Sequence, residues 1–146
     1  MHVDGVPAVS ATAARNFGNM FVEALAAKDA ATLTALFGDE VDFRGLTPGQ
    51  VWEAHTAAGA VSEVILGHWF EPTEVVERVD GIETSVVGDR CRLGYRLLVT
   101  SPAGRFVVEQ QAFLEITEGR ITWMRVLCSG FRPTAGYTWP HHRQET

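Results

Sequence analysis

The chain has 146 residues, 46% of them hydrophobic and 21% charged, which is the size and composition of one globular domain. Its 18 acidic residues outnumber its 12 basic ones and leave a net charge of -6, so it lacks the surplus of Lys and Arg that nucleic acid or an anionic membrane surface requires. The sequence has no signal peptide pattern, no apolar run of membrane-spanning length and no C-x-x-C spacing around Cys91 and Cys128, so we expect a reduced, cytoplasmic protein.

The first elements in chain order are two helices. Ser10 is placed to cap a helix over about residues 11–27, in which apolar side chains recur at helical spacing. Asp29 is placed to cap a short second helix that Gly38 ends. A brief strand over residues 41–44 is predicted next, because polar and apolar residues alternate there.

A third helix is predicted to start at the segment Thr47-Pro48-Gly49-Gln50. Its threonine is placed to cap the helix, its proline suits the first helical position, and its glutamine can complete a capping box. This helix would carry Trp52 and His55 one turn apart, would be interrupted near Gly59 and could resume through Val64-Ile65-Leu66.

From residue 74 onward the pattern changes from helical to alternating, which predicts a meander of strands. Turn motifs such as Gly88-Asp89 and Glu118-Gly119 separate these strands, which we place at residues 75–87, 91–99, 106–116 and 121–128. Three N-terminal helices followed by strands predict an α+β domain with the helices packed on one sheet face. We assign the domain to residues 10–132, with a lead-in over 1–9 and a tail over 133–146.

The layout and two turn motifs resemble a known family. Gly88-Asp89-Arg90 opens one strand and Glu118-Gly119-Arg120-Ile121 opens the last one, after three helices with a short strand behind the second. Over roughly residues 12–132 this resembles the SnoaL-like branch of the NTF2-like superfamily. The resemblance implies a cone: helices on a strongly curved, mixed but mostly antiparallel sheet, enclosing a pocket. It also implies a dimer, and a hydrophobic small molecule as ligand.

Members of that superfamily include polyketide cyclases, ketosteroid isomerases, epoxide hydrolases, dehydratases and plain ligand-binding proteins, so the fold alone does not select a reaction. The isomerases resembled here carry a base aspartate where this chain has Phe43, with Asp42 one position away on the opposite face. Their second acid falls near Gln110, and many SnoaL-like chains end the last strand with Asp where this chain has Cys128. Neither carboxylate of the familiar proton-transfer pair is therefore present.

The inner face of the sheet is predicted from the alternation of apolar residues. Tyr95 and Gln110 fall on the more apolar faces of their strands. In the last strand, a three-residue turn would place Thr122, Met124, Val126 and Cys128 inward, whereas a two-residue turn would place Ile121, Trp123, Arg125 and Leu127 inward. We favour the first alternative because it keeps Arg125 out of an apolar cavity.

Three residues are candidates for catalysis, each with a structural alternative. His55 is a candidate general base, since histidine exchanges protons near neutral pH, or else a surface residue. Tyr95 is a candidate acid or oxyanion donor, or else a core aromatic. Gln110 is a candidate hydrogen-bond partner for a ligand carbonyl or hydroxyl, or else an amide satisfied by Tyr95. His68, beside Trp69, is a further candidate base.

The predicted pocket lining and the predicted interface lie on opposite faces of the sheet. We expect the ligand to contact Phe43, Trp52, Trp69, Val108, Met124 and Cys128. The sequence offers no histidine partner for Cys128, which argues for a small buried residue there and against a nucleophile. The outer face is a candidate homodimer interface, through Phe113, Trp123, Arg125 and Leu127.

No cofactor or metal is expected, because the sequence has no phosphate-binding glycine loop and no carboxylate at ligand spacing from His141-His142. Asp42 and Arg44 are expected to form an exposed ion pair near the pocket mouth. Two functions fit these observations. One is a cyclase, isomerase or dehydratase in which His55 moves a proton while Tyr95 and Gln110 hold an oxygen. The other is a non-catalytic protein that binds a hydrophobic molecule in an aromatic pocket.

Overall fold

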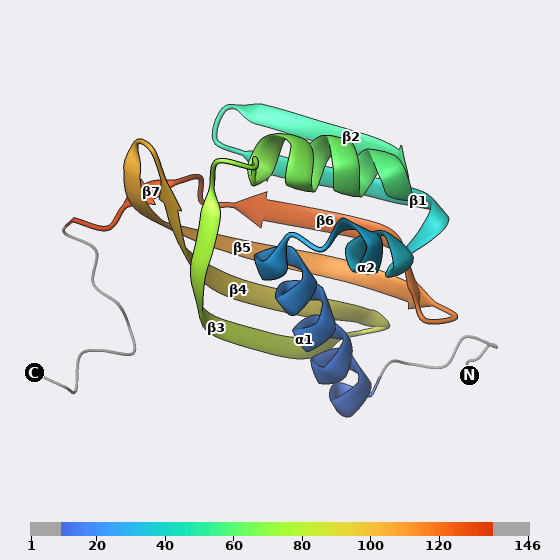
Figure 1. The fold of residues 1–146 in the computed structure, drawn as a ribbon. Coiled ribbons are helices and arrows are strands. Elements are labelled where there is room, and N and C mark those ends of the chain that lie inside the picture. Colours follow the sequence, from blue (N-terminus) through green and yellow to red (C-terminus); the bar gives the residue numbers. More distant parts are fainter. Residues whose placement is uncertain (1–9, 136–146) are drawn as a thin grey trace, which may run out of the picture.

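The structure is a computed structural model that describes residues 10–135. Two helices, a β-hairpin and a third helix precede a meander of long strands (Figure 1). The elements are α1 (Ala11–Ala27), α2 (Ala30–Ala35), β1 (Phe37–Thr47), β2 (Gln50–Thr56), η1 (Gly59–Trp69), β3 (Val75–Val87), β4 (Arg90–Ser101), β5 (Gly104–Thr117), β6 (Arg120–Cys128) and β7 (Arg132–Pro133). None of the helices within 10–135 is both long and apolar enough to cross a bilayer.

The strands form one mixed, mostly antiparallel sheet. Its order is β2-β1-β6-β5-β4-β3, with the short β7 paired to β5. The β1–β6 pair is parallel and the other pairs are antiparallel. All three helices lie over the same face of the curved sheet (Figure 1). The predicted α+β class is therefore confirmed.

The two N-terminal caps form as predicted. The Ser10 hydroxyl oxygen accepts a hydrogen bond from the Ala13 amide at 3.0 Å, and Asp29 accepts one from the Thr32 amide at 3.1 Å. Helix α1 ends at Lys28, whose backbone is left-handed (φ 57°). Its apolar stripe is buried against the sheet, including Phe21 and Leu25.

The third helix is not where the sequence pattern placed it. Thr47 and Gln50 pair across a hairpin between β1 and β2, and Gly49 has a φ of 80°. Proline followed by a glycine of positive φ is also the signature of a type II turn, so the same four residues close a hairpin here and open no helix. The hairpin separates α2 from the third helix, which starts at Gly59. That helix ends with an i→i+5 hydrogen bond from the Phe70 amide to the Ile65 carbonyl at 2.8 Å.

A β-bulge sets the register of the last strand. The turn before β6 has two residues, since Thr117 pairs with Arg120. Thr122 is then the extra residue, because Ile116 pairs with Ile121 while Glu115 pairs with Trp123. Beyond the bulge the inward set is the predicted one of Met124, Val126 and Cys128. The prediction is wrong for Thr122, which is half-buried while Ile121 takes the fully buried position.

One hydrophobic core fills the space between helices and sheet. Phe21, Phe37 and Phe43 are at most 1% exposed, and their rings meet at centroid distances of 6.2 and 6.4 Å. The predicted lead-in lies outside the described residues. So does most of the predicted tail, including His141-His142. Of the predicted tail, Pro133 lies in β7 with Arg132 and pairs with Phe106 of β5.

Candidate functional site

Tyr95 and Gln110 form a buried polar pair on the inner face of the sheet. They sit opposite each other on β4 and β5, at 3% and 1% exposure. The Tyr95 hydroxyl donates a hydrogen bond to Oε1 of Gln110. Burial raises the pKa of Tyr95, so its phenol stays protonated and acts as a donor. This bond occupies the amide oxygen, and Nε2 of Gln110 is buried with no hydrogen-bond partner among residues 10–135.

Trp69 supplies a second donor of the same kind. It is the last residue of η1 and is 5% exposed, and its Nε1 is buried without a hydrogen-bond partner in the part of the chain that the structure describes. The indole packs on Phe43 at a centroid distance of 5.7 Å and lies over Gly45. A Cβ at Gly45 would come within 2.4 Å of two indole ring atoms. Glycine at position 45 therefore makes room for the Trp69 ring.

Both donor residues line one cavity, which we call the Gln110 cavity. It has a volume of about 170 Å³ and is lined by Thr47, Trp52, His68, Trp69, Phe70, Gln110, Cys128, Gly130 and Phe131. A buried donor left unpaired costs about 1–3 kcal/mol. Two such donors on residues that line one mostly aromatic cavity are an arrangement that an acceptor oxygen of a ligand would complete.

His68 lies at the exposed rim of the Gln110 cavity. Its Nδ1 is 2.6 Å from the Glu63 carbonyl oxygen, which can only accept, so Nδ1 carries the hydrogen. In the neutral ring Nε2 then has a free lone pair. The imidazole packs against Trp52 at a centroid distance of 5.0 Å, and Trp52 in turn donates from Nε1 to the Thr47 hydroxyl at 2.8 Å. His68 is thus held with a basic nitrogen available.

Cys128 lies beside Gln110, because the two residues pair across β5 and β6. Its side chain lines the same cavity and is 7% exposed. The Gly130 amide donates a hydrogen bond to its Sγ at 3.4 Å. Gly130 has a φ of 78°, a conformation that favours glycine, and this turn aims the amide back at the sulfur.

The structure brings together five of the sequence-predicted residues: Trp52, His68, Trp69, Gln110 and Cys128 line the cavity. Tyr95 lies behind Gln110 and holds its amide, and Phe43 supports Trp69. Val108 and Met124 are in the core, at 0% exposure, and do not line the cavity.

His55 is not brought to this site. It is exposed on β2, where it borders a shallow depression with Asp42 and Arg44. On a helix, residues 52 and 55 would share a face, but on a strand positions three apart point to opposite faces. Trp52 faces the cavity, so His55 faces away from it. Asp42 is exposed too. Its Oδ1 lies 3.2 Å from Nη1 of Arg125, and the hydrogen bond from Arg125 is the main cause that lowers the Asp42 pKa.

Sequence reasoning underrated His68 and missed Thr47, Phe70, Gly130 and Phe131. The signal for His68 was its place next to a tryptophan, but its role depends on where the third helix ends. Phe131 follows the last long strand and packs on Phe70 at a centroid distance of 6.1 Å. Only the fold places these two segments together.

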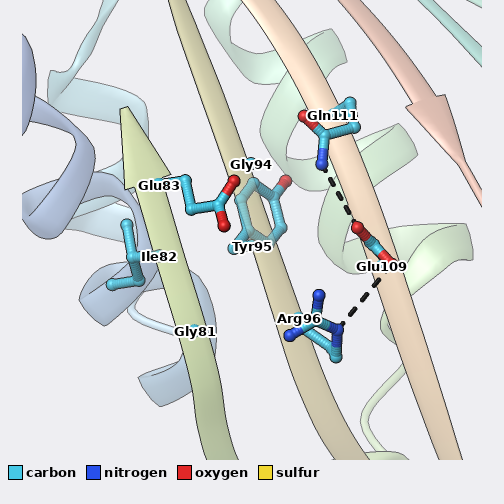
Figure 2. Close-up of a pocket in the computed structure, with 8 residues that line it drawn as sticks. All are labelled: Gly81, Ile82, Glu83, Gly94, Tyr95, Arg96, Glu109 and Gln111. Carbon is cyan, nitrogen blue, oxygen red and sulfur yellow. Dashed lines mark hydrogen bonds and ion pairs between the residues drawn. The ribbon is translucent and has the colours of Figure 1, made fainter. Parts of the chain in front are cut away.

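A second hollow, of about 70 Å³, lies on the outer face of the sheet (Figure 2). Arg96 and Glu109 approach to 3.7 Å there, and Gln111 Nε2 donates to Glu109 at 3.3 Å. Arg96 is also 4.0 Å from Asp80, whose side chain is 9% exposed. These charged groups lie within ion-pair distance of one another, while Nε of Arg96 and Oδ2 of Asp80 have no hydrogen-bond partner among the described residues. We interpret the hollow as a structural ion-pair network.

No family model and no curated protein matches this chain. Solved structures do. The LEH-like epoxide hydrolase of M. tuberculosis is 18% identical, with 82% of this chain and 84% of that chain covered and a TM-score of 0.61. AusH from Aspergillus nidulans is 16% identical, with 90% and 98% covered and a TM-score of 0.65. A candidate SnoaL-like polyketide cyclase from Mesorhizobium loti is 20% identical, with 77% and 96% covered and a TM-score of 0.57.

These likenesses, together with the helices on a curved mixed sheet, show that the chain has the NTF2-like fold. The resemblance to the SnoaL-like branch that the sequence predicted is confirmed at the level of the fold. Isomerases, cyclases and epoxide hydrolases all use this fold, so the reaction has to be argued from the site.

Proposed function

We propose that this protein is an enzyme of the isomerase or cyclase type that binds a hydrophobic carbonyl compound in the Gln110 cavity and moves a proton next to the carbonyl group. The observation that carries the proposal is the pair of buried, unpartnered donors, Nε2 of Gln110 and Nε1 of Trp69, on one aromatic cavity.

The free thiols of Cys91 and Cys128 support a cytoplasmic location.

The proposed chemistry is general base catalysis of enolisation. The ligand carbonyl oxygen accepts hydrogen bonds from Gln110 and Trp69, and Nε2 of His68 removes the proton from the adjacent carbon. The negative charge then develops on the oxygen, where two donors in a water-poor site stabilise it. Tyr95 contributes by fixing the Gln110 amide. His68 returns the proton at a different carbon, or the enolate attacks within the same molecule, which gives isomerisation or cyclisation. Neither route needs a cofactor.

The test uses two probes and a set of variants. Deuterium uptake into cyclohexanone in D₂O, followed by NMR, measures proton removal next to a carbonyl. Binding of 4-nitrophenolate, a flat ring with an anionic oxygen, measures the donor pair through its visible absorbance. His68→Ala should abolish enzyme-dependent exchange and leave 4-nitrophenolate binding within about threefold of wild type.

Tyr95→Phe combined with Gln110→Leu removes the amide without leaving the phenol unpaired, and should weaken 4-nitrophenolate binding by about tenfold or more. His55→Ala is the matched control and should change neither measurement. Binding without exchange in the wild-type protein would favour the non-catalytic binding protein. The proposal would be overturned if the wild-type protein catalysed no exchange and bound 4-nitrophenolate no more tightly than the Tyr95→Phe, Gln110→Leu double variant does.

We further propose that the outer sheet face forms a homodimer interface. A groove of about 370 Å³ runs over it, lined mostly by apolar side chains together with Arg44, Gln111 and Arg125. Leu127, Val51 and Leu46 are 60%, 59% and 48% exposed there, beside Phe113. Apolar groups this exposed and this close together are typical of a surface that a partner covers. Trp123 is already covered by Arg90 and Arg125, at 3.9 and 4.6 Å from the ring centroid.

A further inference from the structure

We propose that Cys128 is a nucleophile toward α,β-unsaturated carbonyl compounds, so that the Gln110 cavity captures enones as thioethers on this residue. The inference rests on the proposed function only in that both use the same cavity and the same donor pair. It assigns a chemical role to a thiol that enolisation does not use.

The placement of Cys128 next to Gln110 is the first argument. Directly opposed residues of antiparallel strands have Cβ atoms about 4.5–5.5 Å apart, and these two are such a pair on the inner face. In an enone, the electrophilic β-carbon is next but one to the carbonyl carbon. A carbonyl oxygen held by Gln110 would therefore lie within one cross-strand spacing of the carbon that a thiol attacks.

The donor pair is the second and independent argument. Gln110 is 1% exposed, its Nε2 has no hydrogen-bond partner among the described residues, and it lines the same cavity as the thiol. Hydrogen bonds to the carbonyl oxygen withdraw electron density from the conjugated double bond and stabilise the enolate that addition produces. The cavity thus has an activating group for the electrophile beside a nucleophile.

The surroundings of the sulfur supply the remaining requirements. His68, which the sequence does not place near Cys128, lines the same cavity and has a free Nε2 lone pair. The Gly130 amide donates a hydrogen bond to the sulfur and holds its side chain in place. Cys91 has none of these features: it is 1% exposed, it lies opposite Leu114, it does not line the cavity, and burial raises its pKa.

The step is an addition that needs no other reactant. The thiol proton moves to Nε2 of His68, and the sulfur electron pair forms the S–C bond to the β-carbon. The π electrons of the carbon–carbon double bond shift to give the enolate, whose charge lies on the oxygen bonded by Gln110 and Trp69. The imidazolium then returns the proton to the α-carbon. The net change is addition of S–H across the double bond, with nothing oxidised or reduced.

The experiment is intact-mass and peptide mass spectrometry of the full chain treated with cyclohex-2-en-1-one, with cyclohexanone as the non-electrophilic match. Labelling by iodoacetamide, run in parallel, measures plain thiol accessibility. We expect one adduct of the enone mass, on Cys128, formed at least tenfold faster than any adduct on Cys91. Cys91→Ala should leave the rate unchanged and Cys128→Ser should abolish the adduct.

The decisive variant is the Tyr95→Phe, Gln110→Leu double change. It should lower the enone rate by about tenfold or more, while the iodoacetamide rate at Cys128 stays within threefold of wild type. Equal enone labelling of both cysteines, no adduct, or an enone rate that the double variant does not alter would overturn the inference. If 4-nitrophenolate binds and the adduct is missing, the inference about Cys128 fails alone; if 4-nitrophenolate does not bind either, the proposed cavity function fails with it.

Discussion

At the scale of single residues, the two ends of the Gln110 amide have different roles. The oxygen accepts the hydrogen bond of Tyr95, while the nitrogen has no partner among the described residues and belongs to a residue that lines the cavity. A tyrosine hydroxyl whose pKa is raised by burial is a dependable donor, because it does not lose its proton in the physiological range. In the proposed site, Tyr95 is thus the positioning residue and Gln110 is the group that would touch a ligand.

Tyr95→Phe should therefore lower both stability and ligand binding. It leaves the buried Oε1 of Gln110 without a donor, which costs about 1–3 kcal/mol of unfolding free energy, and it frees the amide to turn its oxygen toward the cavity. Urea unfolding measures the first effect and 4-nitrophenolate titration the second. In a double-mutant cycle with Gln110→Leu the two changes should be strongly non-additive. Additive losses would mean that the two side chains do not act as a pair.

At the scale of elements, the position of the third helix decides which histidine belongs to the site. Because β1 and β2 form a hairpin, η1 starts late and ends with His68 and Trp69 at the cavity. The β-bulge at Thr122 has a comparable effect on β6, since it returns Met124 and Cys128 to the inner face after a two-residue turn. The N-terminal helices depend instead on local caps.

The Asp29 cap of α2 gives a pH-dependent prediction. The Thr32 side-chain hydrogen bond, followed by the Thr32 backbone bond, lowers the Asp29 pKa below its usual 3.8. A lowered folded-state pKa means a contribution that is fully present above 3.8 and is lost as the pH falls through the folded-state value. Asp29→Ala should lower the urea midpoint at pH 7, with a smaller loss at about pH 2. Asparagine can still cap the helix but does not titrate, so Asp29→Asn should change the urea midpoint by the same amount at both pH values. A pH-independent loss in Asp29→Ala would contradict this assignment.

At the scale of the whole molecule, the curved sheet has two faces of different character. Its inner face, with the helices, encloses the core and the Gln110 cavity, while its outer face carries ion pairs around Arg96 at one side and the apolar groove around Leu127 at the other. An ion-pair network needs no partner, whereas exposed apolar groups of this extent gain free energy when another surface covers them.

Leu127→Asp should consequently convert a dimer to a monomer, because it places a charge within the apolar groove. Sedimentation equilibrium at tens of micromolar measures this. Val87→Asp is the matched control: Val87 is similarly exposed, at 53%, and lies outside the groove, so the change should leave the dimer intact. A wild-type monomer at these concentrations would show that the outer face is not a homodimer interface.

The sequence by itself determined the α+β class, the caps at Ser10 and Asp29, and the inward position of Tyr95 and Gln110. These features depend on short-range rules, since side chains alternate along a strand and a cap bonds an amide three residues away. Each can be inferred without knowing what packs against the segment.

Only the tertiary structure decided whether Thr47-Pro48-Gly49-Gln50 closes a hairpin or opens a helix, and with it the choice of His68 over His55. A helix N-cap contributes about 1 kcal/mol locally, which is less than what pairing β1 with β6 and burying Phe43 contributes. That pairing joins residues some 80 positions apart, such as Phe43 and Met124. Long-range contacts of this kind, which no local pattern encodes, brought His68, Gln110 and Cys128 around one cavity.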